Sequence, residues 1–390
     1  MLYWALMAKK DINKAAIALH KKLGGKIRIT PALEVKSRDD LSLIYTPGVA
    51  AVSSLVAKNP KLARDYTIKG KMVAVISDGS AVLGLGNIGA LGALPVMEGK
   101  CALFKTFADV DAFPIVLDTQ DPDEIIETVV RIAPAFGGIN LEDIAAPNCF
   151  YIEEELKKRL SIPVMHDDQH GTAVVVLAGL INAAKVVGKK LNDPNYFVVV
   201  SGVGAAGVAI MRLLKLAAPR VNIVAVDSTG VVWEGRKNLN DTKKKLIKDK
   251  IIFAKKGGDL AAALVDANIF IGVSKPGVLT QHMVHTMAPR PIIFAMANPA
   301  PEILPELAHQ AGAAVVATGR SDYPNQVNNS LAFPGIFRGA LSKGVRTITD
   351  AMKIQAAYNL AALVKRPTKA KIIPGPFEKA VASAVAKAIR

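Results

Sequence analysis

Residues 197–207 read FVVVSGVGAAG, an apolar run that leads directly into glycines at positions 202, 204 and 207. Gly202 permits a tight turn, Gly204 lets a pyrophosphate approach the backbone, and Gly207 allows a helix to pack closely on the preceding strand. The start of that helix, at Ala205 and Ala206, supplies backbone amides and a partial positive charge for the phosphates. The stretch therefore predicts the strand, turn and helix that open a dinucleotide-binding domain.

The chain after this stretch alternates apolar runs with helical patterns. Strands are expected at residues 196–201, 221–226, 267–272, 292–295 and 313–317, the rhythm of a doubly wound parallel sheet. Asp227 follows the second of these strands, where a carboxylate that binds both ribose hydroxyls favours NAD. Arg236 and Lys237 lie close enough in sequence to leave a 2′-phosphate, and therefore NADP, open.

The chain before this stretch shows a second alternation. The patterns predict a helix over residues 10–23, strands over 72–77, 115–118 and 163–165, a capped helix from Asp121, and a long apolar helix over 173–187. We therefore expect an α/β protein of two domains, residues 1–170 and residues 171–390, the second of them Rossmann-like. The tail over 377–390 is expected to form a final helix that docks on one of the domains.

The composition fits two large apolar cores. Of the 390 residues, 51% are hydrophobic and 21% are charged, which excludes a disordered chain. Two cysteines, Cys101 and Cys149, are too few for a disulfide framework and indicate a reducing compartment. The apolar runs break well short of the ~20 residues of a membrane span, and residues 1–7 lack the basic leader of a signal peptide. A cytoplasmic protein without membrane attachment is expected.

The net charge of +16 raises the question of a nucleic-acid partner. The basic residues are scattered, however, and no recognisable RNA- or DNA-binding motif accompanies them. A solvated lysine-rich surface is the favoured interpretation, and no specific nucleic acid is expected. The same charge suits anionic ligands, such as a small dianionic acid and a dinucleotide.

Two pairs of adjacent carboxylates are candidate metal ligands: Glu142 with Asp143, and Asp167 with Asp168. Mg²⁺ and Mn²⁺ take oxygen ligands in octahedral geometry and leave positions for substrate and water. Either pair alone is better explained as a helix cap or a solvated surface. Both pairs, however, follow strand ends or glycine-rich segments, where α/β sites gather, so two loops are expected to bring them around one divalent cation.

Four further residues near these motifs carry weaker signals. His166 and His170 have no third histidine to support a zinc site, and supporting or helix-capping roles are expected for them. Tyr45 lies in a turn and Lys100 follows a glycine; from the residues alone, structural packing explains each of them better than chemistry does. A lysine that is buried near a cation would have a depressed pKa and serve as a general base.

Seven motifs stand in a fixed order along the chain: YTPGVA at 45–50, DGSAVLGLGNIG at 78–89, MEGK at 97–100, GGINLED at 137–143, HDDQHGT at 166–172, ANP at 297–299 and NN at 328–329. In this order they resemble the malic enzyme family, in its short prokaryotic form, from about residue 20 to about residue 385. The resemblance implies oxidative decarboxylation of L-malate to pyruvate and CO₂, with reduction of NAD or NADP and dependence on Mg²⁺ or Mn²⁺. It also implies a homodimer or a dimer of dimers, in which a neighbouring subunit can supply the Tyr45 loop.

The resemblance also implies a role for each matching residue. It assigns the metal to Glu142, Asp143 and Asp168, and the general acid to Tyr45. It assigns the general base to Lys100, with Asp167 assisting proton transfer. Asn298 and Asn329 match residues that hold the substrate carboxylates and the nicotinamide side of the site.

Three positions depart from the family pattern. Ala81 stands where animal and plant relatives carry a substrate-binding arginine, Asn87 replaces a common aspartate, and Ala51 with Val52 replaces an acidic residue and a proline. Two alternatives stay open. One is a malolactic reaction, which retains the cofactor and releases lactate. The other is a non-catalytic protein with a decayed site that senses dinucleotides or binds nucleic acid.

Overall fold

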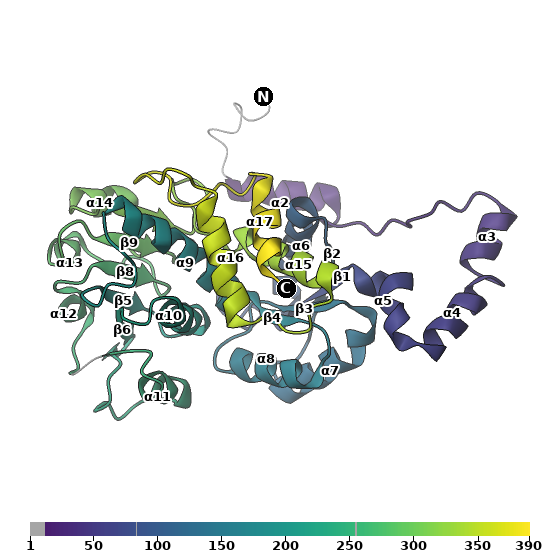
Figure 1. Cartoon of the computed structure of the whole chain (residues 1–390), viewed down its shortest axis with the longest axis horizontal. Helices are drawn as coiled ribbons and strands as arrows, with labels where there is room; N and C mark the ends of the chain where they lie inside the picture. The colour runs from purple at the N-terminus through teal and green to yellow at the C-terminus, as the bar shows by residue number, and fades with distance from the viewer. Residues whose placement is uncertain (1–11, 83, 254–255) are drawn as a thin grey trace, which may run out of the picture.

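Two parallel sheets organise the chain in the computed structural model, which describes residues 12–82, 84–253 and 256–390 (Figure 1). The first sheet has the strand order β2-β1-β3-β4, and its strands are β1 (Met72–Ser77), β2 (Asp111–Val116), β3 (Gly138–Leu141) and β4 (Val164–His166). All of its pairings are parallel. The helices between its strands are α6 (Gly89–Ala108), α7 (Pro122–Ile132) and α8 (Asn148–Arg159).

The second sheet follows the predicted nucleotide-binding pattern. Its strand order is β10-β9-β8-β5-β6-β7, with β5 (Phe197–Ser201), β6 (Asn222–Asp227), β7 (Gly230–Val231), β8 (Ile269–Gly272), β9 (Ile292–Ala295) and β10 (Val315–Thr318). β6 and β7 lie on one side of β5, and β8, β9 and β10 lie on the other, so the order in which strands are added reverses between β5 and β8. Ligands bind at this point in doubly wound folds. The predicted doubly wound sheet is thus confirmed. The short edge strand β7 is antiparallel to β6 and was not predicted.

Helices cover the second sheet and link its strands. They are α10 (Ala205–Ala217), α11 (Asp241–Lys248), α12 (Leu260–Leu264), α13 (Gln281–His285) and α14 (Pro305–Gln310). The helix α10 begins directly after Gly204, and Gly202 has a φ of 109°, a conformation that favours glycine. The predicted turn between strand and helix therefore forms.

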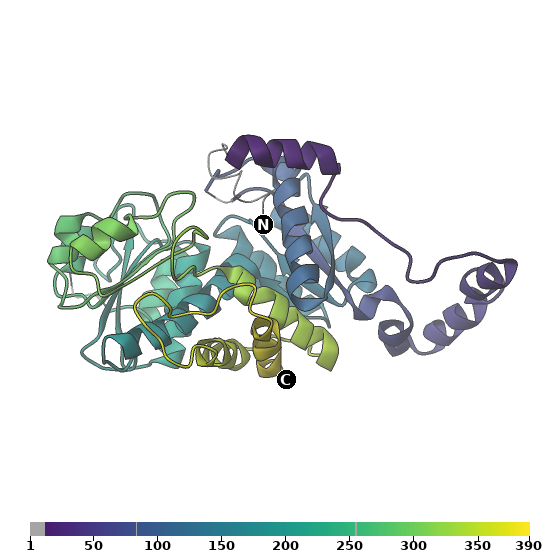
Figure 2. The same cartoon turned by 90° about the horizontal axis from the view of Figure 1, so that it is seen from above.

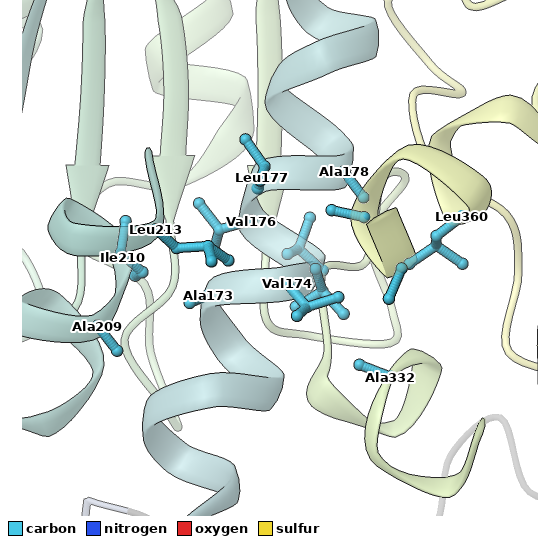
Figure 3. Close-up of a cluster of buried hydrophobic side chains, with 14 of the residues drawn as sticks. Ala173, Val174, Val176, Leu177, Ala178, Ala209, Ile210, Leu213, Ala332 and Leu360 are labelled. Atoms are coloured by element: carbon cyan, nitrogen blue, oxygen red, sulfur yellow. The ribbon is translucent and has the colours of Figure 1, made fainter. Parts of the chain in front are cut away.

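The helix α9 (Asp167–Val186) joins the two sheets and is buried along most of its length. Its apolar residues pack against α10 on one side, as Val176 and Leu213 show, and against α16 (Asp350–Ala362) on the other, through Leu360 (Figure 3). The predicted helix over 173–187 thus exists, but it begins six residues earlier. Gly171 does not break it, because this helix is held by burial of its apolar side chains rather than by propensity.

The last part of the chain returns to the first sheet. The helices α15 (Phe333–Lys343) and α17 (Ala380–Ala388) pack together, and the rings of Phe333 and Phe337 contact Phe104 of α6 at centroid distances of 4.7 and 5.6 Å. The predicted final helix is therefore α17. The division into domains at residue 170 stays a prediction, because the C-terminal helices contact the first sheet as well as α9.

The N-terminal segment extends away from the two sheets. After α2 (Ile12–Leu23), an extended chain leads to an arm of two helices, α3 (Arg38–Ile44) and α4 (Val49–Lys58), which projects from the body in both views (Figures 1 and 2). The short elements η1 (Pro60–Leu62), α5 (Ala63–Tyr66) and η2 (Ile68–Gly70) lead the chain back to β1. None of the residues of α3 or α4 is buried.

The stretch Arg38–Lys58 is long and apolar enough, by composition, to cross a membrane. The structure divides it at residues 45–48 into the two short helices α3 and α4. A span needs about 20 residues in one helix, which neither of them provides. The expected segment over 1–7 lies outside the described residues.

One element boundary differs from the prediction and another agrees with it. The expected strand over 115–118 is β2, which starts at Asp111, and its polar first residue hid that start. The capped helix from Asp121 is confirmed as α7, since the Asp121 carboxylate accepts hydrogen bonds from the backbone N–H groups of Asp123 and Glu124.

Candidate active site

The carboxyl ends of β3 and β4 bring the two predicted pairs of carboxylates together. Leu141 of β3 is in register with His166 of β4. Because the strands are parallel and adjacent, the residues that follow them, Glu142 with Asp143 and Asp167 with Asp168, emerge side by side. The expectation of two loops is wrong for the second pair, because Asp167 and Asp168 form the first turn of α9.

Three of these carboxylates surround one point. Glu142, Asp143 and Asp168 each offer an oxygen, and the three oxygens lie within 4.8 Å of one another. The backbone N–H of Asp143 donates to Asp168 Oδ2 at 2.8 Å, which fixes the two segments relative to each other. Asp143 has a φ of 52°, a left-handed conformation that aspartate adopts more readily than most residues.

Lys100 on α6 completes the cluster from the other side. Its Nζ donates to Asp167 Oδ2, lies 2.7 Å from Glu142 Oε1, and sits over the Phe333 ring at 4.2 Å from the centroid. Burial lowers the pKa of Lys100, but the charges of Asp167 and Glu142 outweigh it and raise the pKa above the ordinary lysine value. The expectation of a depressed pKa applied to a lysine beside a cation, and it stays a prediction.

Burial also shifts the carboxylates themselves. It raises the pKa of Asp167 to about 6, although Lys100 opposes this change. It raises the pKa of Glu142 well above its ordinary value, again against Lys100 and with Asp168 adding to the rise. The cluster thus contains four carboxylates and one lysine, which pairs with Glu142 and Asp167. An excess of negative charge in a buried place, made of oxygen ligands, fits a hard divalent cation.

A cavity of about 550 Å³ adjoins the cluster and connects the two sheets. Asp143 and Asp168 line it, and so do four predicted residues of the second sheet's layer: Gly204, Ala205, Ala206 and Asn298. Asn329, in η4 (Asn329–Leu331), lines it as well. The structure therefore brings two of the predicted metal ligands, part of the predicted cofactor residues and both predicted substrate residues around one space. Gly207 lies in the first turn of α10, behind this wall.

Asp227 lines a second cavity, of about 1030 Å³, together with Ser201 and Gly202. Its carboxylate accepts from Arg236 at 2.9 and 2.7 Å and from Lys243 at 2.6 Å. Burial raises the pKa of Asp227, but these donors outweigh it and hold the pKa well below the ordinary value. Asp227 is therefore already paired with two cations, one of which, Lys243, was not predicted.

Tyr45 is the predicted residue that this chain does not bring to the site. It ends α3 in the arm, its ring is 66% exposed, and it does not line the cavity beside the carboxylates. The arm projects from the body in both views (Figures 1 and 2).

The three departures from the family pattern have different surroundings. Ala81 lines the active-site cavity, and neither a lysine nor an arginine is among the described residues that line it. Asn87 forms two hydrogen bonds with Gln120, at 3.0 and 2.9 Å. Ala51 and Val52 lie in α4 of the arm.

Several polar residues of the site were not predicted. Asn140 Nδ2 donates to Glu142 Oε2 at 3.0 Å. Behind α9, His170, for which a supporting or helix-capping role was expected, forms hydrogen bonds with two residues that were not predicted, Glu153 and Lys353. A signal for Glu153 was present, because it falls on the apolar face of its helix beside Ile152 and Leu156, where an unpaired charge is unfavourable. Lys353 is likewise buried, but only the fold shows its partners.

Comparisons with known proteins agree with this arrangement. A family model described as "Malic enzyme, N-terminal domain" matches residues 24–157, and one described as "Malic enzyme, NAD binding domain" matches residues 169–389. The bifunctional malic/malolactic enzyme of Bacillus subtilis is 55% identical over 385 residues, which are 97% of this chain and 92% of that protein. The NADP-dependent malic enzyme of Haemophilus influenzae is 49% identical over 91% of this chain, which spans 47% of that longer protein. The crystal structure of the NAD-dependent malic enzyme of Thermotoga maritima superposes with a TM-score of 0.91 at 49% identity, over 96% of this chain and 98% of that one.

Proposed function

Since the chain belongs to the malic enzyme family, we propose that it oxidises L-malate and decarboxylates it to pyruvate and CO₂, with reduction of NAD or NADP. The observation that carries this proposal is the convergence of Glu142, Asp143 and Asp168 beside Lys100, on a cavity that the glycine turn before α10 also lines. The same cavity therefore has room for the ion, the acid and the reactive end of the coenzyme.

The metal would be held by Glu142, Asp143 and Asp168, whose oxygens lie within 4.8 Å of one another. A bound Mg²⁺ or Mn²⁺ supplies a positive charge that lowers the pKa of the malate hydroxyl and withdraws electrons from the keto group that follows. Asp143 and Asp168 line the cavity, so the ion would lie between the protein and the substrate.

Lys100 is proposed as the general base. Glu142 and Asp167 hold its proton in place, and their charges keep its pKa high. A cation held by Glu142 would take away part of this attraction, and Asp167, whose pKa burial raises to about 6, would be the group that takes up the proton of Lys100. Neutral Lys100 would then take the proton of the malate hydroxyl while the nicotinamide ring accepts the hydride from C2.

The oxidised intermediate is a β-keto acid, which loses its distal carboxylate as CO₂ and leaves the enol form of pyruvate. A proton at C3 completes the reaction, and Tyr45 is the proposed donor. We further propose a homodimer, alone or in a dimer of dimers, in which the arm of one subunit carries Tyr45 to the site of the other. Leu43 is 72% exposed and Ile44 is 42% exposed, so the arm presents apolar side chains that a partner would cover.

The length of the arm helices supports this dimer. α3 has 7 residues and α4 has 10, and isolated helices shorter than about 12–15 residues are marginal in water. A second subunit would supply the packing that the chain itself does not provide. A cytoplasmic location is proposed, because a chain with two cysteines and no disulfide framework indicates a reducing compartment.

Substrate recognition would fall to amides rather than to a cation. With Ala81 in place of an arginine, Asn298 and Asn329 are the proposed partners of the malate carboxylates. The loop that contains Ala81 approaches Asn298 closely, since a Cβ at Gly84 would lie 2.3 Å from the Asn298 carbonyl oxygen. Gly84 therefore has to be glycine for this loop to close the cavity.

We propose that both NAD and NADP are accepted. Asp227 favours the free ribose of NAD, but Arg236 and Lys243, which pair with it, would meet the 2′-phosphate of NADP. Arg236→Gln is expected to raise the KM for NADP by roughly 10- to 100-fold, as for the loss of a charged hydrogen bond, and to change the KM for NAD little. The matched control is Lys248→Gln, which removes a charge from an exposed position of α11. Equal effects of Arg236→Gln on both coenzymes would contradict this assignment.

A second reaction is suggested by the similarity to the Bacillus subtilis relative, a bifunctional malic/malolactic enzyme. In a malolactic reaction the coenzyme is retained and lactate is released. The experiment that tests the main proposal is the appearance of reduced coenzyme from L-malate and Mn²⁺, with NAD and NADP compared and pyruvate and lactate measured. Pyruvate in equal amounts with reduced coenzyme supports the proposal. Lactate without reduced coenzyme selects the malolactic reaction, and no turnover of malate contradicts both.

A further inference from the structure

Behind the carboxylate cluster, a chain of polar side chains crosses three helices. Glu153 lies on α8, Gln169 and His170 lie on α9, and Lys353 lies on α16. They surround a cavity of about 190 Å³ that is separate from the active-site cavity. Glu153, Gln169 and Lys353 are buried, and the mechanism proposed above uses none of them.

The first half of the chain has a defined direction. A lysine ammonium group only donates, and Lys353 Nζ lies 3.1 Å from His170 Nδ1, so this nitrogen accepts. The proton of the neutral ring is then on Nε2, which donates to Glu153 Oε2 at 3.0 Å. Glu153 also accepts from Lys157 Nζ at 2.8 Å.

The second half runs from Glu153 to a proposed metal ligand. Gln169 Nε2 donates to Glu153 Oε2 at 3.4 Å and to His166 Nδ1 at 3.2 Å. The opposite orientation of the amide would place its oxygen against the carboxylate, which is unfavourable. Because His166 Nδ1 accepts, its Nε2 carries the proton, and this nitrogen lies 3.3 Å from Asp168 Oδ2.

Glu153 also fixes the backbone at the start of α9. His166 is the N-cap residue of this helix, and its side chain makes no capping hydrogen bond. Instead, the backbone N–H of His166 donates to Glu153 Oε1 at 2.9 Å. Asp167 and Asp168 are the next two residues, so a residue of α8 determines where the first turn of α9 lies.

Stability alone does not account for this arrangement. Replacing a buried ion pair by well-packed apolar side chains is often neutral or stabilising. Glu153 lies between the buried residues Ile152 and Leu156 of α8 and the wall of α9, where an apolar side chain would pack. What an apolar side chain cannot do is accept a hydrogen bond from His166 and set the proton position of its ring.

We propose that Glu153 is a positioning residue, which holds His166 and the first turn of α9 so that Asp168 joins Glu142 and Asp143 around the divalent cation. Gln169 is the connection between Glu153 and the His166 ring. The inference rests on the proposed function, because it takes these three carboxylates as the ligands of the cation. Groups that orient metal ligands in this way typically change metal affinity 10- to 100-fold when they are removed.

The test measures binding of Mn²⁺ alone, without malate or coenzyme, from the electron paramagnetic resonance signal of the free ion. Glu153→Gln keeps the shape of the side chain and removes its charge, and the Kd for Mn²⁺ is expected to rise roughly 10- to 100-fold. The matched control is Glu154→Gln, which removes the same charge from the next, exposed residue and is expected to leave the Kd unchanged. Affinity for the reduced coenzyme, followed by its fluorescence, reports whether the second sheet and its helices remain folded.

A second variant keeps the inference testable if Glu153→Gln does not fold. Gln169→Met removes the donor between Glu153 and His166 without removing a charge, and the Kd for Mn²⁺ is expected to rise in the same direction. Wild-type affinity in Gln169→Met, and in Glu153→Gln where it folds, overturns the inference.

Asp168→Asn separates this result from a failure of the proposed function. If the wild-type protein binds Mn²⁺ and Asp168→Asn does not, the metal site stands and the positioning variants decide the inference alone. If Asp168→Asn binds Mn²⁺ as the wild-type protein does, the proposed metal site and the inference both fail.

Discussion

The carboxylate cluster and the arm both carry residues for which the sequence predicts a function, but these residues differ in burial and in their contacts. Lys100, Glu142 and Asp167 are buried and ion-paired within one chain. Tyr45 is mostly exposed, in a pair of helices without a buried residue. The charged side chains of the first region are paired within the chain, and the second exposes apolar side chains that the proposed dimer would cover.

The two regions differ in what holds their functional side chains in position. The charges of the cluster are held by strands β3 and β4 and by α6 and α9, whose positions are fixed by the cores of the protein. The arm has no core of its own, so its structure and the place of Tyr45 would be set by association. A site that draws on both regions works only as an oligomer.

The largest effect is expected at the cluster. Lys100→Ala removes the proposed general base and should lower kcat by roughly 10²- to 10⁴-fold. Coenzyme affinity should change little, because Lys100 does not line the cavity of Asp227. Steady-state kinetics with malate and Mn²⁺ measure the effect. Lys105→Ala, at an exposed position of the same helix, is the control. Near-normal turnover in Lys100→Ala would remove its assigned role and leave the cluster as a purely structural ion-pair network.

A smaller effect is expected in the arm. Leu43→Glu places a charge on an apolar position that the proposed dimer covers. The loss of about 3 kcal/mol of apolar burial corresponds to roughly 10²-fold weaker dimerisation. Sedimentation measures the dimer Kd, and the activity should become dependent on protein concentration. Leu216→Glu, at an exposed position on α10, should change neither property. A Leu43→Glu dimer as tight as the wild-type dimer would show that the arm does not form the interface.

The smallest effect concerns Asp227, a carboxylate outside both regions whose partners, Arg236 and Lys243, lie in the same chain. Its pKa is lower in the folded than in the unfolded protein, where it is about 3.9. The folded form therefore gains stability from the ionised carboxylate above that pH and loses it as the pH falls further.

Asp227→Asn lacks this contribution. The difference in the free energy of unfolding between the wild-type protein and Asp227→Asn should therefore be largest near neutral pH and shrink below about pH 4. Urea unfolding at pH 7, 5 and 3 measures it. A difference that does not depend on pH would mean that the ion pairs of Asp227 contribute no net stability.

Much of the cluster was predictable from the sequence, because acidic pairs that follow strands of a parallel sheet emerge at the same edge of that sheet. The glycine turn at residues 202–207 was also predictable, since Gly202 has a positive φ and a Cβ at Gly207 would lie 1.9 Å from the Gly202 carbonyl oxygen. The helical start at Asp167 was not, because the first residues of α9 are polar and the expected helix began where the apolar pattern begins, at residue 173.

Other features of the site had no signal in the sequence. The pairing of Asp227 with Lys243 joins residues 16 positions apart across a loop, and the contact of Lys353 with His170 joins residues 183 positions apart. Such contacts arise from tertiary packing and not from local pattern. Tyr45 was assigned by resemblance alone, because the residues around a tyrosine in a turn give it no signal of their own.

The most direct test of the central claim combines two inactive variants. A heterodimer of Lys100→Ala and Tyr45→Phe, purified by two different affinity tags, contains one site with Lys100 of one subunit and Tyr45 of the other, if the arm acts across the dimer. We predict about half of the wild-type activity per dimer, since one of two equivalent sites is complete. Activity no higher than that of the two parent variants would contradict a site built from the cluster of one subunit and the arm of its partner.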